Sequence, residues 1–239
     1  MTRTAPRFSR FRDLDRETVN VDWQVHTTWS DGRADVRATL EAARERRLAA
    51  IALTEHVRRD TAWFGAFAQT VRAEARAVPG VDVYVGCEAK ALDADGTLDV
   101  SDEIRAHCDL VLGVVHRFPD GRGGFLDVKR LDWEACAEVE WQLTRGLLRT
   151  APIDVLGHPG GMTQRRFGRY PATLFRRMLE ASGERGIAVE INSSYVADWE
   201  GFLALCEEVN PLISIGSDAH GPEEVGRCRD LLRRSARFS

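Results

Sequence analysis

The sequence has almost no lysine, no long apolar run and no excess of positive charge. Its 239 residues include two lysines, Lys90 and Lys129, so arginine supplies nearly all of the positive charge. No apolar run approaches the roughly 20 residues that cross a bilayer, and the basic N-terminal segment lacks the apolar stretch of a signal peptide. The formal net charge of -4 argues against a nucleic-acid coat or a polybasic membrane anchor.

The sequence also lacks any paired cysteine motif. Its five cysteines are odd in number, scattered, and form no C-x-x-C pair. This spacing is typical of reduced thiols and excludes a disulfide scaffold or a thiolate zinc site, so we expect a cytoplasmic protein. A hydrophobic fraction of 44% and a charged fraction of 29% predict a globular chain with a substantial core.

Short, largely apolar runs alternate with helical patterns along the chain. Apolar residues recur at helical spacing from residue 36 and along a stripe over residues 131–147, and Pro171 favours a helix over 170–182. Residues 91–100 contain a turn signal and are predicted to be an excursion. The predicted strands, which read as buried on both faces, are residues 19–25, 50–54, 81–86, 110–115, 153–157, 187–191 and 212–216.

About seven strand–helix units predict a single-domain α/β fold in which parallel strands close into a barrel. The barrel domain is expected over residues 19–239, after an N-terminal extension of residues 1–18. A doubly wound open sheet is the alternative arrangement.

Metal-binding residue types lie at or just beyond the ends of the predicted strands. Five of the six histidines have this placement, and His107, in a predicted helix, is expected to be structural. Parallel strands of a barrel end on one rim, so these side chains are predicted to converge and bind zinc, manganese or iron, with one carboxylate bridging two ions. The residues concerned are His26, Asp31, Glu55, His56, Glu88, His116, His158, Asp218 and His220.

The same residues resemble the motifs of the PHP (polymerase and histidinol phosphatase) domain family. The first family motif, D-x-H-x-H-T-x-x-S-D-G, aligns with residues 22–32, DWQVHTTWSDG. Five further motifs follow in order, up to about residue 221: Thr54-Glu55-His56, Gly86-Cys87-Glu88, a strand ending in His116, Gly157-His158-Pro159, and Ser217-Asp218-Ala219-His220. The set is most similar to the PHP domain attached to bacterial X-family DNA polymerases.

The resemblance implies a distorted (β/α)7 barrel that holds two or three divalent ions (manganese, zinc or iron). It assigns Gln24, His26, Glu88 and Asp218 to a first ion, Glu88, His116 and His158 to a second, and Asp31, His56 and His220 to a third. Gln24 replaces a family histidine and Glu55 replaces an aspartate. An amide oxygen binds zinc less well than imidazole. The first site is therefore expected to hold its ion loosely, to hold a harder ion such as manganese, or to be empty. Glu55 is open to a role as ligand, base or support for a ligand.

These features predict a metal-dependent phosphoesterase that hydrolyses a small phosphomonoester with a metal-activated water. Guanidinium groups suit phosphate, and the predicted substrate-binding residues are Arg117, Arg165, Arg166, Arg169 and Asn192, with Glu55, Glu88 and Asp218 as the catalytic ones. One alternative is a 3′-end nuclease or phosphodiesterase acting on single-stranded DNA, which predicts salt-sensitive binding, and nucleic acid is the less favoured partner. The other is a non-catalytic metal-binding regulatory module. No membrane partner is expected.

Overall fold

The computed structural model describes residues 5–235 and 237, and in them eight strands form one sheet in the order β1-β8-β7-β6-β5-β4-β3-β2. Neighbouring strands from β2 to β8 pair in parallel. These seven strands correspond to the seven predicted ones. They are β2 (Val21–Val25), β3 (Ala50–His56), β4 (Asp82–Lys90), β5 (Leu110–Val114), β6 (Val155–Leu156), β7 (Ala188–Asn192) and β8 (Leu212–Gly216).

The two edges of the parallel sheet meet beyond the strand ends. Val25 forms a parallel bridge with Ala219, and the His26 amide donates to the Ala219 carbonyl at 2.8 Å. At the opposite end of β8, the short strand β1 (Ser9–Arg10) pairs antiparallel with it, and the 3-10 turn η1 (Phe11–Asp13) buries Phe11. The sheet therefore forms the predicted distorted barrel and not a doubly wound open sheet.

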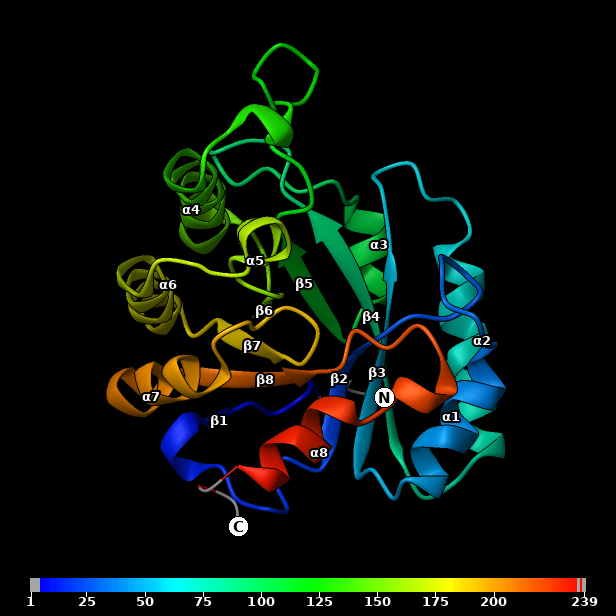
Figure 1. The fold of residues 1–239 in the computed structure, drawn as a ribbon. Coiled ribbons are helices and arrows are strands. Elements are labelled where there is room, and N and C mark those ends of the chain that lie inside the picture. Colours follow the sequence, from blue (N-terminus) through cyan, green and yellow to red (C-terminus); the bar gives the residue numbers. More distant parts are fainter. Residues whose placement is uncertain (1–4, 236, 238–239) are drawn as a thin grey trace.

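Helices surround the sheet on its outside, as Figure 1 shows. They are α1 (Val36–Glu45), α2 (Phe64–Ala77), α3 (Asp102–His107), α4 (Trp133–Thr150), α5 (Gly161–Phe167), α6 (Ala172–Arg185), α7 (Trp199–Val209) and α8 (Arg227–Arg234), with 3-10 turns η2 (Val128–Arg130) and η3 (Pro222–Glu224). Asp35 and Asp132 cap α1 and α4 by accepting main-chain N–H groups, as short acidic side chains do at N-caps. In the described residues, no helix has the length and apolar character that a bilayer crossing requires.

The predicted connections agree with the structure in most places. Residues 91–100 form an excursion closed by an antiparallel bridge between Ala91 and Leu98. The helix predicted at 170–182 begins two residues later, because Pro171 is its extended N-cap residue. Between β5 and α4 the chain projects beyond the rim (Figure 1), and Phe125 on this projection is half exposed.

Candidate metal centre

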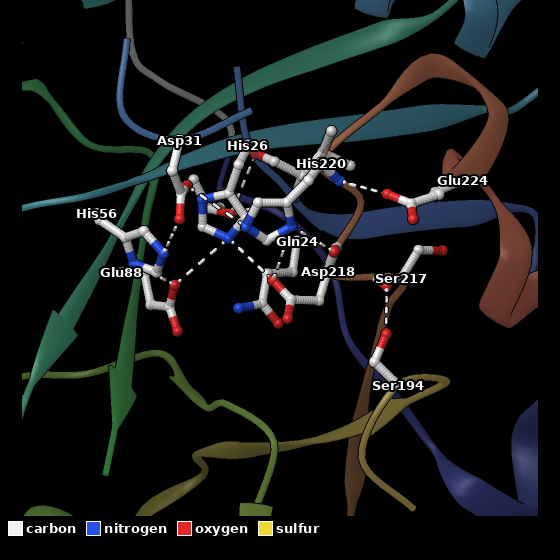
Figure 2. A network of polar contacts seen from close by, with 12 residues as sticks. Gln24, His26, Asp31, His56, Glu88, Ser194, Ser217, Asp218, His220 and Glu224 are labelled. Atoms are coloured by element: carbon white, nitrogen blue, oxygen red, sulfur yellow. Dashed lines mark hydrogen bonds and ion pairs between the residues drawn. The ribbon is translucent and has the colours of Figure 1, made fainter. Parts of the chain in front are cut away.

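The strand ends bring five histidines and three acids together at one rim of the barrel. Part of this cluster is seen in Figure 2. Its members come from six strand ends or the loops that follow them: His26 and Asp31 after β2, His56 on β3, Glu88 on β4, His116 after β5, His158 after β6, and Asp218 and His220 after β8.

Glu88 lies at the centre of the cluster and contacts four imidazoles. Its Oε1 is 2.8 Å from His158 Nε2 and 3.1 Å from His116 Nε2. Its Oε2 is 2.8 Å from His56 Nδ1 and 3.4 Å from His26 Nε2. Burial disfavours the charged carboxylate, but the surrounding imidazoles outweigh it and hold the pKa of Glu88 well below its usual range. Glu88 is therefore an anion that faces both halves of the cluster.

The remaining acids extend the cluster on the side of His26. Asp218 Oδ1 lies 3.0 Å from His26 Nε2. Asp31 lies between two imidazoles, 3.3 Å from His56 Nε2 and 3.3 Å from His220 Nε2. Each acid is thus close enough to an imidazole for both side chains to bind one ion.

The donor set fits divalent metal ions. Two groups, His26 with His56 and His220, and His56 with Glu88 and His116, each place their ligand atoms within 4.8 Å of one another. His26 Nε2 and Glu88 Oε2 are buried and make no well-directed hydrogen bond. Imidazole nitrogens and carboxylate oxygens in this arrangement are the ligands of zinc, manganese and iron.

Metal uptake is expected to release protons. Burial lowers the pKa of His26 and His158, but Asp218 and Glu88 outweigh it and raise both values to about 9. Both imidazoles are therefore protonated at pH 7 without metal, and an ion must displace those protons. Metal affinity should rise with pH up to about 9. Calorimetric titration at pH 7 in two buffers of different ionisation enthalpy should show at least two protons released per loaded chain. Equal heats in both buffers would contradict this.

Glu55 lies beside the cluster without entering it. Its Oε1 accepts from the Thr27 amide at 2.9 Å and the Thr27 hydroxyl at 2.7 Å, and its Oε2 accepts from the Ser30 hydroxyl. Burial raises the pKa of this carboxyl. Because both oxygens hold the loop between His26 and Asp31, the structure argues against the predicted catalytic role and for support of the ligands.

Gln24 shares the inner face of β2 with His26, but its amide oxygen is turned away from the ligands. Asn192 Oδ1 accepts from the Ser194 amide at 2.8 Å, which fixes Asn192 so that its Nδ2 donates to Gln24 Oε1 at 3.1 Å. Gln24 Nε2, a donor, is buried and has no hydrogen-bond partner in the described part of the chain. In this orientation the amide oxygen of Gln24 is engaged by Asn192. Asn192, predicted to bind substrate, is fully buried and does not line the cavities over the cluster.

The four predicted arginines separate into two pairs. Arg165 lines a cavity of about 280 Å³ over the cluster, and Arg117 lines an adjoining one. Arg166 instead donates to the Lys129 carbonyl at 2.9 Å, and Arg169 stacks on Trp133, so neither guanidinium lines these two cavities. Successive residues of a helix point about 100° apart, which places Arg165 and Arg166 on different sides of α5.

Aromatic residues at the centre escaped the sequence analysis. Tyr195 stacks on His158 with ring centroids 4.6 Å apart and lines the same cavity as Arg165. Trp29 and Trp63, 5.7 Å apart, line the adjoining cavity. The only sequence signal for Tyr195 and Trp29 was their position in loops that follow strands, which is too general to single them out.

The chain is similar in sequence to known proteins. A probable phosphatase of Caldanaerobacter subterraneus is 27% identical over 170 residues, which cover 65% of this chain and 58% of that protein. The chain thus spans a little over half the length of that relative. The DNA polymerase/3'-5' exonuclease PolX of Bacillus subtilis is 24% identical over 183 residues, covering 74% of this chain and 29% of PolX.

The chain is also similar in fold to solved structures. The histidinol phosphate phosphatase of Lactococcus lactis, solved with zinc, L-histidinol and phosphate, aligns with a TM-score of 0.68 and 17% identity, covering 92% of this chain and 94% of that one. This likeness shows a shared fold. A family model described as the PHP domain matches residues 22–194, which is most of the chain. This range contains every metal-ligand candidate except Asp218 and His220, which follow β8. The chain therefore belongs to the PHP domain family.

Proposed function

We propose that the chain is a metal-dependent phosphoric ester hydrolase that acts on a small phosphomonoester. The observation that supports this most directly is the position of Glu88, an anionic carboxylate between four imidazoles with a cavity above it. We propose that the centre holds two or three divalent ions (manganese, zinc or iron), with Glu88 shared between two of them.

The contacts support three groups of ligands. His26 and Asp218 would hold one ion with Glu88, His116 and His158 would hold a second with Glu88, and Asp31, His56 and His220 would hold a third. When bound, such ions lower the pKa of water toward neutrality and neutralise the charge that develops on phosphate oxygens. No protein nucleophile is required.

Arg165 would bind the phosphate group. It lines the cavity over the cluster, and within the described part of the chain its guanidinium has no hydrogen-bond or ion-pair partner. A guanidinium can bind two phosphate oxygens at once. The side chains of His56 and His116, about one third exposed, form the open side of the cluster that faces this cavity.

The organic part of the substrate would occupy the adjoining cavity of about 750 Å³. This cavity shares Asp31, His56, Glu88 and His116 with the metal centre, and its volume is within the range of small-ligand sites. Beyond the centre it is lined by Trp29, Trp63, Arg58 and Arg117, among others. Indole rings beside guanidinium groups suit a phosphomonoester that carries a planar ring, such as a nucleotide or a histidinol-phosphate-like compound.

Trp29→Ala is expected to weaken the binding of a substrate that carries a planar ring. An aromatic contact of about 1.4 kcal/mol corresponds to a tenfold change, so kcat/KM for adenosine monophosphate should fall about tenfold. The value for ribose 5-phosphate, which lacks the ring, should change little. Trp133→Ala, which removes an indole that stacks on Arg169 outside this cavity, is the matched control. Equal losses for both substrates would show that Trp29 does not contact the ring.

The proposed function is tested by elemental analysis of protein purified without added metal, paired with a panel of phosphoesters. Two or more bound ions with turnover of phosphomonoesters are the expected result. Bound metal without turnover on any phosphoester would instead favour a regulatory module. Salt-sensitive cleavage of a single-stranded oligonucleotide, without phosphomonoester turnover, would favour a nuclease.

A further inference from the structure

Three buried carboxylates lie next to the metal ligands without belonging to them. They are Asp22, Glu55 and Glu190, which we call the carboxylate tier, and all three side chains are fully buried. Among the described residues none of them has a lysine or arginine partner. Each instead accepts a main-chain N–H from a loop that follows a neighbouring strand.

Asp22, on β2, holds the loop that carries Asp218. Its Oδ1 accepts from the Ser217 amide at 2.9 Å, and its Oδ2 accepts from the Gly226 amide at 2.7 Å. The next residue, Asp218, has a φ of 50°, in the left-handed region that non-glycine residues rarely adopt. Asp22 thus fixes the backbone of a ligand across the seam between β2 and β8.

Glu190, on β7, holds the backbone of His158 directly. Its Oε2 accepts from the His158 amide at 2.7 Å and from Asn192 Nδ2 at 3.1 Å. His158 also has a positive φ, 25°. Gly216 leaves room for this carboxylate, because a Cβ there would lie 1.8 Å from Glu190 Oε1.

Glu55, on β3, holds the loop after β2. Its bonds to Thr27 and Ser30 fix the segment that joins His26 to Asp31. The same loop turns back closely at Gly32, where a Cβ would lie 2.4 Å from the His26 carbonyl oxygen. Three carboxylates on three strands therefore hold the loops that carry His26, Asp31, His158 and Asp218.

We infer that the carboxylate tier positions the metal ligands by holding the main chain of the strand ends through hydrogen bonds. Strained ligand conformations persist only where surrounding contacts hold them, and a buried N–H needs an acceptor. A carboxylate can accept on both oxygens, whereas an amide side chain must present a donor on one side. The inference uses the metal centre of the proposed function but does not depend on turnover.

The first test compares Glu190→Ala with Glu190→Gln. Glutamine can place its oxygen where Oε2 lies, so it can still accept the His158 N–H, whereas alanine cannot. Affinity for Zn²⁺ is measured by competition with a chelator, and folding by circular dichroism of the metal-free protein. Alanine should weaken binding about 10- to 100-fold, as losses of groups that support ligands do. Glutamine should recover most of that loss. Equal losses in both variants would overturn the inference.

The second test compares Asp22→Asn with Glu55→Gln, since each variant replaces a buried carboxyl group with the amide of the same length. Both oxygens of Asp22 accept main-chain N–H groups, so asparagine must place its NH2 against one of them. Oε2 of Glu55 accepts only from the Ser30 hydroxyl, which can rotate to accept from the NH2 of glutamine. We expect Asp22→Asn to weaken Zn²⁺ binding about 10- to 100-fold and Glu55→Gln to bind nearly as well as the unaltered chain. Equal losses would point to charge alone and overturn the inference.

Asp154→Asn is the control at the other end of the barrel. Asp154 Oδ2 accepts from the Val111 amide at 2.8 Å, the same kind of link at the start of a strand. Its loss should leave Zn²⁺ affinity unchanged, and an equal loss of affinity there would overturn the inference. If Asp22→Asn does not fold, the Glu190 pair decides the outcome. A chain that binds Zn²⁺ as expected but hydrolyses no phosphoester would contradict the proposed function and leave this inference standing.

Discussion

Replacing Glu88 with glutamine should abolish activity and most metal binding while leaving the barrel folded. Among the described residues, Glu88 is the one carboxylate that contacts four of the imidazoles, and glutamine has neither its charge nor a second acceptor oxygen. A shared anionic ligand contributes several kcal/mol, and about 4 kcal/mol corresponds to roughly a thousandfold loss in kcat/KM. The expected result is at least that loss, together with reduced metal content.

The measurement pairs elemental analysis with phosphomonoester kinetics and circular dichroism. Glu103→Gln, at an exposed position on α3 outside the set of metal ligands, is the matched control and should behave as the unaltered chain. A fully active Glu88→Gln variant with normal metal content would eliminate the bridging role. Glu88 also raises the pKa of His26 and His158, so the metal-free variant should hold fewer protons at pH 7.

The strands could be predicted from the sequence because they are buried on both faces. All five residues of β5 and of β7 are buried, and such runs are visible without knowing their partners. Their ends were less predictable. β4 continues to Lys90, four residues beyond the prediction, because it still pairs with β5 there, whereas β6 keeps only two paired residues. Strand ends depend on the neighbouring strand, which a single segment does not reveal.

The residues of the metal centre could be predicted because they follow the ends of the predicted strands. The rim position of a side chain follows from where its strand ends, so His116 and His158 were found from residue type and place alone. The direction of a side chain does not follow from its place in the sequence. Arg169, in the loop between α5 and α6, stacks on Trp133, and Glu55 accepts hydrogen bonds from Thr27 and Ser30.

The carboxylate tier left a faint signal in the sequence. Asp22 and Glu190 each lie within a strand whose residues are all buried. A buried acid without a basic partner must find other donors, and here those donors are main-chain N–H groups of distant loops. The acid is visible in the sequence, but its donor is 195 residues away in the case of Asp22.

Gln24→His should strengthen metal binding and lower the stability of the metal-free protein. Residues 24 and 26 lie on the same face of β2, so an imidazole at position 24 would point toward the cluster beside His26. In the view of Figure 2, Gln24 lies below the imidazole rings of His26 and His220. Imidazole is a better ligand for zinc than an amide oxygen, and a gain of about 1.4 kcal/mol corresponds to tenfold tighter binding. We expect at least this gain.

The loss of stability in the metal-free chain comes from the contact with Asn192. The substitution removes the acceptor that Gln24 offers to Asn192 Nδ2, and a lost buried hydrogen bond costs about 1 kcal/mol. The unfolding temperature should therefore fall in the presence of a chelator and rise above that of the unaltered chain when Zn²⁺ is added. Gln24→Asn, which has the same amide on a shorter stem, should show no gain in affinity and serves as the control. Unchanged Zn²⁺ affinity in Gln24→His would mean that position 24 does not face the ion held by His26 and Asp218.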